Sequence, residues 1–220
     1  MGKERIWAYH EAKTIADEVV ALLQPFCDKI IIGGSIRREK SLVSDVEILC
    51  LPKVHKVLVH PKASTQLDMF ASVEVAKEPV EVVQRIPEFV VALYDAVLVV
   101  EGCPKSGRYV KGIRNEIQVD IFIPQRSDFI RQAIIRTGSR FYVKDVVAFA
   151  WSRKGLCGTA NGLRKRKECT RARSKVTGKY YGSYFLKEEV TNPWKPPVFK
   201  TEEEFFSFLG LPFKEPKDRK

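Results

Sequence analysis

One short stretch constrains the fold more than any other, because it combines glycines, arginines and closely spaced acids. Residues 33–50 read Gly-Gly-Ser-Ile-Arg-Arg-Glu-Lys-Ser-Leu-Val-Ser-Asp-Val-Glu-Ile-Leu-Cys and follow the apolar run 30–32, which is typical of a short buried strand. Asp45 and Glu47 lie two residues apart within a second apolar run. Residues at this spacing on a strand project from the same face. The stretch therefore predicts two adjacent carboxylates beside a glycine-rich turn.

The turn at Gly34 and Ser35 is suited to binding a phosphate group. If residues 36–40 begin a short helix, the backbone N–H groups of the turn lie at its N-terminus, where the helix dipole favours an anion. Arg37 and Arg38 add positive charge beside it. Two carboxylates facing the same way next to this turn are what a divalent metal ion with a phosphate chain needs.

A third acid stands in a later apolar strand. The segment 115–123 alternates Ile and Val residues with Gln118, Asp120 and Phe122, so Asp120 has no partner nearby in the sequence. Burying an unpaired carboxylate is costly, so this side chain either reaches solvent at a sheet edge or meets a cation. A metal ion shared with the two earlier acids accounts for all three acids at once.

Helical and strand patterns mix along the first part of the chain, which predicts the α+β class. We expect helices at 4–23 and 86–94, an ambiguous helix at 65–83 broken at Pro79, and strands at 30–32, 57–59, 96–100, 108–113 and 115–123. Beyond Pro124 the pattern is mainly helical, with helices at 127–136, 141–153 and 203–209. We therefore predict two domains, at 1–124 and 125–220.

Positive charge is concentrated in the second half of the chain. The net charge is +11, yet residues 1–120 hold 16 Lys and Arg against 17 Asp and Glu. Residues 121–220 hold 22 Lys and Arg against 10 Asp and Glu, so the whole excess lies there. This segregation favours a polyanion partner, although a basic surface that only aids solubility has the same composition.

The densest basic cluster, within 161–179, precedes an aromatic cluster within 180–185. Basic runs with adjacent aromatic residues suit a nucleic-acid backbone with stacked bases or sugars. A nuclear-localisation signal and a disordered insertion have similar compositions. The first residues lack the apolar core of a secretion signal, and no apolar run has the length of a membrane span. We expect an intracellular monomer, cytoplasmic or associated with nucleic acid.

Together these motifs resemble a known family. Gly34-Ser35-Ile36-Arg37-Arg38, then Asp45-x-Glu47 and a distant strand Asp120, are similar to the nucleotidyltransferase superfamily. Closer likeness comes from Thr137-Gly138-Ser139 and from the closing segment 209–219, which resemble the family X DNA polymerases, the group of DNA polymerase beta. The resemblance spans nearly the whole chain. It implies a nucleotidyltransferase palm, a mixed sheet flanked by helices, followed by a small, mainly helical thumb-like domain, without the N-terminal lyase and fingers-type domains.

The resemblance also implies an activity and the residues that carry it. A nucleotidyl group would pass from a (deoxy)nucleoside triphosphate to a DNA primer 3′-hydroxyl, with release of pyrophosphate, in template-directed gap filling during repair. Asp45, Glu47 and Asp120 would be catalytic and would hold two Mg²⁺ ions, or Mn²⁺. The nucleotide-binding residues would be Arg5, Gly34, Ser35, Arg38, Ser44 and Gly138. The basic residues expected on DNA are Lys144, Arg164, Lys165, Arg166, Lys167, Arg171 and Arg173.

The sequence departs from the family pattern at three places near the expected site, one of which is the pair of polar thumb positions that here hold Arg140 and Val143. Glu47 stands where the family normally has Asp, and it still offers oxygen ligands to Mg²⁺. Ile135-Arg136 replaces a Tyr-Phe pair that lies against the sugar. Two alternatives therefore stay open: a nucleotidyltransferase that acts without a template on RNA or DNA ends, and a nucleic-acid-binding module without catalysis.

Overall fold

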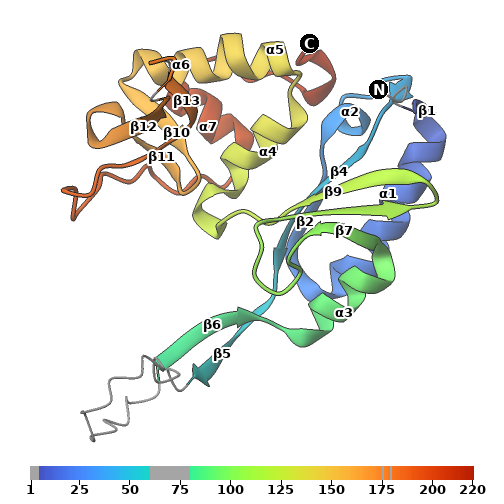
Figure 1. Ribbon diagram of the computed structural model, residues 1–220. Coiled ribbons are helices and arrows are strands. Elements are labelled where there is room, and N and C mark those ends of the chain that lie inside the picture. Colours follow the sequence, from blue (N-terminus) through green and yellow to red (C-terminus); the bar gives the residue numbers. More distant parts are fainter. Residues whose placement is uncertain (1–4, 60–79, 175, 179) are drawn as a thin grey trace, which may run out of the picture.

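The computed structural model describes residues 5–59, 80–174, 176–178 and 180–220. Helices and strands are mixed along the chain, and the strands form mixed sheets. This arrangement confirms the predicted α+β class (Figure 1).

A five-stranded sheet forms the first half of the molecule, in the order β2-β4-β9-β8-β7. Strands β4 and β9 pair in parallel, and the other neighbours pair antiparallel. The five strands are β2 (Cys27–Ile32), β4 (Val46–Pro52), β7 (Leu98–Gly102), β8 (Tyr109–Arg114) and β9 (Ile117–Phe122). A two-stranded sheet of β1 (Trp7–Ala8) and β3 (Leu42–Val43) lies beside it.

The described residues of this half form the helices α1 (Tyr9–Leu23), α2 (Gly34–Arg37) and α3 (Pro87–Ala96), with a 3₁₀ turn at Gln24–Phe26. Helix α1 begins later than predicted, because Trp7 and Ala8 pair with β3 instead. The Ala8 N–H then donates to Glu11 Oε2 at 3.0 Å, which caps the helix. Pro87 starts α3, where its missing N–H costs no helical hydrogen bond.

The alternation of residues along β4 separates two hydrophobic cores. Val46, Ile48 and Cys50 face α1 and α3 in the first core. Leu49 and Leu51 face the other way and belong to the second core, which is otherwise built mainly from residues 129–209. Successive strand residues point to opposite faces of a sheet, so one strand can serve both cores. The face opposite α1 and α3 is therefore the face that meets the C-terminal half.

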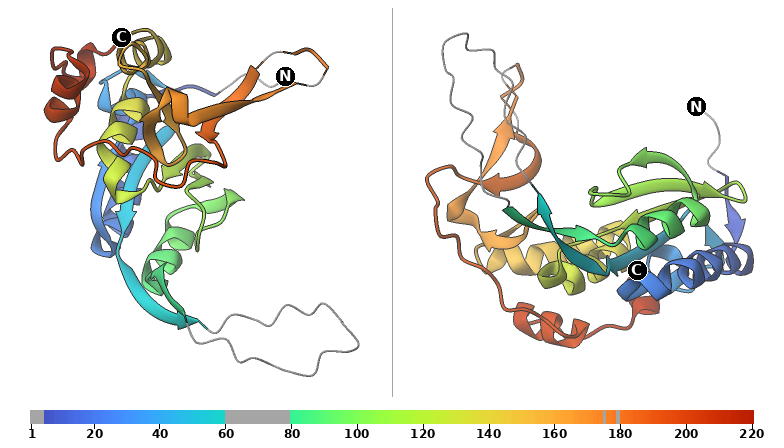
Figure 2. Two further views of the ribbon diagram at one scale, coloured as in Figure 1. Left: turned by 90° about the vertical axis from the view of Figure 1, so that its left-hand side faces the viewer. Right: turned by 90° about the horizontal axis from the view of Figure 1, so that it is seen from below.

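A two-stranded ribbon, β5 (Val54–Val59) paired with β6 (Val80–Arg85), extends away from the sheet (Figures 1 and 2). The ambiguous helix expected at 65–83 lies mostly outside the described residues, and at 80–83 the prediction is wrong. The valines there are β-branched and favour the extended conformation.

The C-terminal half combines helices with a second sheet. Its helical segments are Arg126–Asp128 (3₁₀), α4 (Phe129–Thr137), α5 (Arg140–Tyr142), a π-helix (Val143–Ala148), α6 (Phe149–Arg153), Arg166–Glu168 (3₁₀), α7 (Glu202–Leu209) and Pro216–Asp218 (3₁₀). Its sheet has the order β11-β10-β13-β12. Those strands are β10 (Leu156–Thr159), β11 (Gly162–Lys165), β12 (Cys169–Arg173) and β13 (Tyr180–Leu186).

The prediction that the C-terminal half is mainly helical did not include this four-stranded sheet. Strands β10 and β11 form a tight hairpin in which Gly162 adopts a φ of +98°, a conformation that suits glycine. On β12, Arg171 and Arg173 add charge to a short strand and hide its apolar pattern. The end of the chain follows its prediction: the Thr201 hydroxyl caps α7, and Gly210 ends it with a φ of +74°.

A buried ion network ties the end of the chain to the α2 turn. Arg219 is 0% exposed and donates to Glu202 Oε2 at 2.5 Å, while Arg37 donates to Glu202 Oε1 at 2.7 Å. Arg37 also donates to Thr137 Oγ1 at 2.8 Å. The Arg219 carbonyl accepts from the Ser139 N–H at 3.2 Å. The helix that starts at Glu202, the α4 end and the α2 turn are thus held in one arrangement.

This network predicts a large stability loss for Arg219→Ala. The substitution leaves the Glu202 carboxylate buried with one fewer cation, and removing one partner of a buried pair costs roughly 3–5 kcal/mol. Urea denaturation monitors the change. The exposed Lys217→Ala exchange two residues away is the control and should change the free energy of unfolding by no more than about 0.5 kcal/mol. Equal losses for the two variants would rule out a structural role for the network.

Candidate active site

The sheet brings the three predicted acids to one place on one face. In the parallel ladder between β4 and β9, Glu47 is the direct register partner of Asp120. Asp45 lies two residues before Glu47 and so projects from the same face. This is the face that carries Leu49 of the second core, because its residues alternate with Val46 and Ile48 of the first core. All three carboxylates are half-buried.

The proximity of the acids changes their proton affinity. The pKa of Glu47 is raised to about 7, first by burial and then by the charges of Asp45 and Asp120. Arg136 and Arg38 act in the opposite direction on the same carboxylate. The charges of Asp45 and Asp120 beside Glu47 form a local excess of negative charge, which a bound cation would neutralise.

Asp120 shows the same effect, because burial and the Asp45 charge raise its pKa. Its Oδ1 accepts from Tyr109 Oη at 2.9 Å and from Gln118 Nε2 at 3.1 Å, and both bonds oppose the rise. Desolvation together with the Asp120 hydrogen bond raises the pKa of Tyr109 to about 12, so the phenol remains a donor at neutral pH. Asp45, just before β4, is also held by a hydrogen bond: Ser44 Oγ donates to Asp45 Oδ1 at 2.9 Å.

The glycine turn packs directly against the acid strand. The Gly33 N–H donates to the Glu47 carbonyl at 2.7 Å. Gly34 has a φ of +61°, and a Cβ atom there would lie only 2.5 Å from Glu47 Oε2. A side chain at Gly34 would therefore be strained and would collide with the carboxylate. Gly34 is needed so that the turn and the acid can be neighbours.

Polar groups of the turn lack partners within the described part of the chain. Ser35 Oγ is buried there without a hydrogen bond, and so is Arg38 Nε. Arg38 Nη1 donates to the Thr137 carbonyl at 2.6 Å, which aims the guanidinium toward the α4 end. Burial lowers the pKa of Arg38, and the charges of Glu47 and Asp45 partly oppose this. Buried polar groups are normally satisfied, so these atoms suit an external hydrogen-bonding group such as phosphate.

The acids suit a metal ion by their chemistry, since Mg²⁺ prefers carboxylate oxygens. As the side chains stand, no group of three or more His, Cys, Asp or Glu residues within the described ranges is arranged to hold an ion. Like charges repel, and the hydrogen bonds from Ser44 and Tyr109 hold two of the carboxylates to neighbouring side chains. The residue types, the shared face and the raised pKa values fit a divalent cation, and binding would require rotation of side chains.

Three further residues shape the site and were not predicted as functional: Tyr109, Gln118 and Arg136. The Arg136 guanidinium lies 3.8 Å from the centre of the Phe122 ring. Tyr109, Asp120, Phe122 and Arg136 line a pocket of about 450 Å³ at the junction of the two halves. The alternation along 115–123 placed Gln118 and Phe122 on the Asp120 face, but Tyr109 and Arg136 reach that face only through long-range packing.

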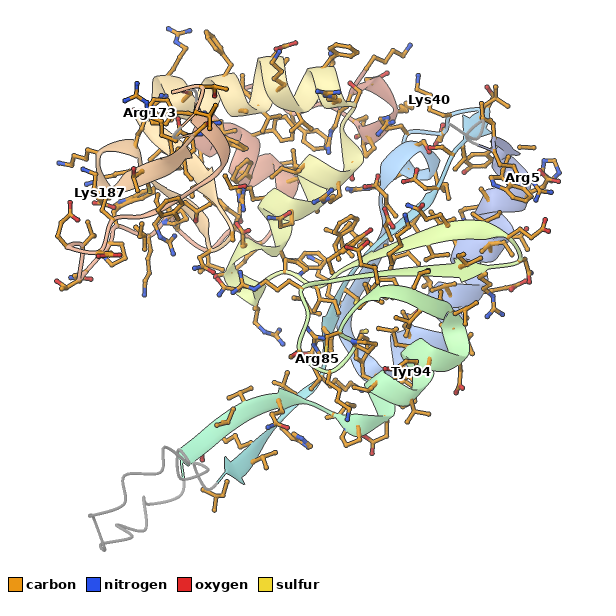
Figure 3. The ribbon with its side chains drawn as sticks, in the orientation of Figure 1. Arg5, Lys40, Arg85, Tyr94, Arg173 and Lys187 are labelled. Atoms are coloured by element: carbon orange, nitrogen blue, oxygen red, sulfur yellow. The ribbon has the colours of Figure 1, made fainter. Side chains whose placement is uncertain are left out.

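The structure places some predicted nucleotide-binding residues in other contacts. Arg5 pairs with Glu116 Oε2 at 2.5 Å, in the turn between β8 and β9, and its guanidinium lies over the Trp7 ring (Figure 3). Gly138 ends α4, and a Cβ atom there would lie 2.8 Å from Val143 Cγ2. Its backbone is thus close to α5 and part of the turn that holds Arg37 and Arg38.

The predicted DNA-binding residues are not alike. Arg164 is only 8% exposed and donates to the Leu163 carbonyl at 2.6 Å, so little of its charge reaches the surface. Lys144 is exposed on the π-helix beside Asp145. The remaining five lie along the second sheet and are exposed or half-buried: Lys165, Arg166, Lys167, Arg171 and Arg173.

Comparison with models of known protein families found no match, and comparison with curated protein sequences found none either. Within the described residues, no helix combines the length and apolar character needed to cross a membrane.

The raised pKa of Glu47 predicts a pH-dependent stability when metal is chelated with EDTA. In the unfolded chain this carboxyl titrates near pH 4.3, whereas in the folded chain it titrates at about 7. The folded state loses stability as pH rises through this window, and the full loss is present above pH 7. Glu47→Gln should therefore raise the free energy of unfolding by roughly 3–4 kcal/mol at pH 8 and hardly at all at pH 4.

The exposed Glu188→Gln exchange serves as the matched control in the same denaturation series. It should give the same small change at both pH values. A Glu47→Gln effect that does not vary between pH 4 and pH 8 would contradict the electrostatic description of the acid cluster.

Proposed function

We propose that the chain is a metal-dependent nucleotidyltransferase of the family X DNA polymerase type. It would transfer a nucleotide from a (deoxy)nucleoside triphosphate to a DNA primer 3′-hydroxyl and release pyrophosphate, filling gaps during repair. The single observation that carries the proposal is the register pairing of Glu47 with Asp120, next to Asp45 and against the Gly34-Ser35 turn. An acid cluster and a phosphate-binding turn in contact are what triphosphate chemistry requires.

The two halves take the parts of a palm and a thumb in this proposal. The five-stranded sheet with α1 and α3 is the palm, over residues 1–124, and the basic half, over residues 125–220, is the thumb. The boundary near Pro124 is supported by the two hydrophobic cores, which meet at the β4 residues Leu49 and Leu51. The acid face lies between the two halves, where a nucleic acid could contact both.

Asp45, Glu47 and Asp120 would hold Mg²⁺ in the active enzyme. When bound, two such ions neutralise charge on the attacking and leaving oxygens of an in-line phosphoryl transfer. Around them, Tyr109 and Gln118 orient the Asp120 carboxylate by hydrogen bonds. The backbone of the Gly34 turn keeps Glu47 in position.

Ser35 and Arg38 would bind the phosphates, since each presents a buried polar atom without a partner in the described chain. Arg136 adds positive charge that acts on Glu47 and lies where the family carries an aromatic pair against the sugar. Its guanidinium over Phe122 would therefore border the sugar of the incoming nucleotide. Nucleic acid is favoured as the acceptor because the basic excess lies in the half that faces the acids.

Primer extension with Mg²⁺ or Mn²⁺ on gapped, nicked and single-stranded DNA tests the proposal. Wild-type protein should extend the primer, and Asp120→Asn should lower the rate by a factor of at least about 10³, because one of three metal-binding carboxylates is lost. The same exchange at Asp95, exposed on α3, is the matched control and should leave the rate unchanged.

The panel includes all eight ribo- and deoxyribonucleoside triphosphates, with and without a template. Incorporation that ignores the template would indicate an end-adding transferase instead of a gap-filling polymerase. Absence of extension on every substrate, by a protein that still binds DNA, would leave the chain as a binding module and would overturn the proposal.

The basic residues predict a second, separate result. Replacing Lys165, Arg166 and Lys167 together by Ala should weaken duplex binding and reduce the slope of log K against log salt by up to about 2–3, since each phosphate contact contributes roughly 0.9. Fluorescence anisotropy at salt concentrations of roughly 50 to 200 mM measures this slope. The control triple exchange at Lys13, Lys53 and Lys56, on the palm, removes the same charge. An equal slope change in the control would reject direct phosphate contacts.

A further inference from the structure

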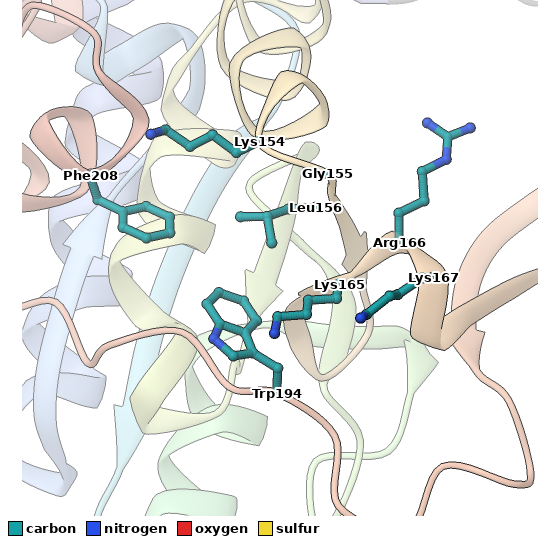
Figure 4. Close-up of a pocket in the computed structure, with 8 residues that line it drawn as sticks. All are labelled: Lys154, Gly155, Leu156, Lys165, Arg166, Lys167, Trp194 and Phe208. Carbon is teal, nitrogen blue, oxygen red and sulfur yellow. The ribbon is translucent and has the colours of Figure 1, made fainter.

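A pocket on the C-terminal half has the chemistry of a nucleotide site but lies away from the acids. Its volume is about 740 Å³, within the range of roughly 300–1,000 Å³ typical of ligand pockets. The pocket is lined by Leu156 together with basic and aromatic residues: Lys154, Lys165, Arg166, Lys167, Trp194 and Phe208 (Figure 4). The basic and aromatic residues come from the end of α6, the end of β11, the 3₁₀ helix Arg166–Glu168, the segment before α7, and α7 itself.

Two aromatic rings and a leucine give the pocket an apolar interior. Trp194 and Phe208 are half-buried and pack against the second core, so part of each ring remains open. Phe208 is steadied by Phe199 and Phe205, with ring centres 5.1 and 6.3 Å away. Aromatic rings fixed in this way provide stacking surfaces for a nucleobase at little entropic cost.

Among the described residues that line the pocket, four are cationic and none is acidic. Lys154 Nζ lies 5.9 Å from the centre of the Phe208 ring. The nearby Glu168 carboxylate accepts from the Trp194 backbone N–H at 3.1 Å, so it holds that segment in place. The combination of an apolar interior with a cationic rim matches a base joined to phosphate.

The pocket is separated from the acid cluster by the length of the β10–β11 hairpin. At the turn end of the hairpin, Ala160 lines the pocket that also contains Asp120. At the open end, Leu156 pairs with Lys165, three residue pairs away from the Thr159–Gly162 pair. At about 3.3 Å per residue, the two ends are roughly 10 Å apart. A ligand in this pocket would therefore lie beside the reaction site and not within it.

The pocket rim continues into the ribbon formed by β12 and β13. Arg166 lines the pocket and also lies 5.5 Å from the centre of the Tyr184 ring, where Arg171 lies at 5.1 Å. Further along, Arg173 lies 5.8 Å from the Tyr180 ring centre. Arginines stacked on tyrosines thus lead from the pocket along the ribbon. A row of this kind suits a chain of phosphates better than a single small anion.

We propose that this pocket binds an unpaired nucleotide of single-stranded nucleic acid, with the backbone continuing along the β12–β13 ribbon. A base within a duplex is stacked and paired, and its face cannot reach Trp194 or Phe208, so the pocket selects single strands. The inference rests on the nucleic-acid partner in the proposed function but not on catalysis. The protein would hold a single-stranded overhang or displaced strand while the acids act on a primer end.

Fluorescence anisotropy with a labelled oligothymidylate of about 12 nucleotides tests this, alongside a blunt duplex of equal length, in EDTA and without triphosphate. Trp194→Leu should weaken single-strand binding about tenfold, because a stacking ring is lost, and should leave duplex binding within about twofold. Trp194→Phe keeps a ring and should restore single-strand binding. The control Trp7→Leu removes a tryptophan on the palm and should change neither affinity.

Loss of affinity for both ligands by Trp194→Leu, or for neither, would overturn the proposal. Tight binding of free thymidine triphosphate to this pocket, with no gain from the longer strand, would also overturn it, because the site would then serve a small molecule. If Trp194→Leu does not fold, quenching of tryptophan fluorescence tests the proposal instead. The oligonucleotide should quench the fluorescence of wild-type protein more strongly than that of Trp194→Phe. Equal quenching would contradict the proposal. Primer extension depends on the acid cluster and not on this pocket. A negative result in one of the two assays therefore does not imply a negative result in the other.

Discussion

The parallel pairing of β4 with β9 is the interaction on which the rest of the site depends. It sets Glu47 opposite Asp120 and, through the alternation of strand residues, puts Asp45 on the same face. A shift of one residue would turn Asp120 into the first core and bring Val119 to the acid face. Holding the acids on this half-buried face has a cost, because burial first and the charge of Asp45 second raise the pKa of both Glu47 and Asp120. A cation and a phosphate chain would offset that cost together, which links the strand register to the proposed chemistry.

The same face of the sheet serves stability as well as function. Next to the acids, Leu49 and Leu51 continue the β4 face into the second core, so the C-terminal half packs within a few residues of the carboxylates. The Arg37–Glu202–Arg219 network then fixes α2 and the α4 end relative to each other. Arg37 is therefore a structural residue beside the Gly34-Ser35 turn, whereas Arg38 keeps a buried nitrogen free of partners in the described chain. In the proposed function, the first of these adjacent arginines would position the turn and the second would bind phosphate.

Local patterns in the sequence predicted much of the first half, and long-range pairings were beyond them. Alternation of apolar and polar residues was enough to predict the strand of Asp120 and the shared face of Asp45 and Glu47. It could not predict that these strands are parallel neighbours, or that Tyr109 and Arg136 would reach the acids. The second sheet was missed because charged residues on β12 obscure its periodicity. Arg164 was expected on a nucleic acid because of its charge, yet the fold covers its side chain.

Anomalous diffraction from crystals soaked with Mn²⁺ and a non-hydrolysable deoxynucleoside triphosphate would show whether the three acids bind metal. Metal peaks are expected within bonding distance of Asp45, Glu47 and Asp120, with the triphosphate on Ser35 and Arg38. Manganese and triphosphate bound elsewhere on the chain, or triphosphate on the turn with no metal at the three carboxylates, would contradict the proposed metal site.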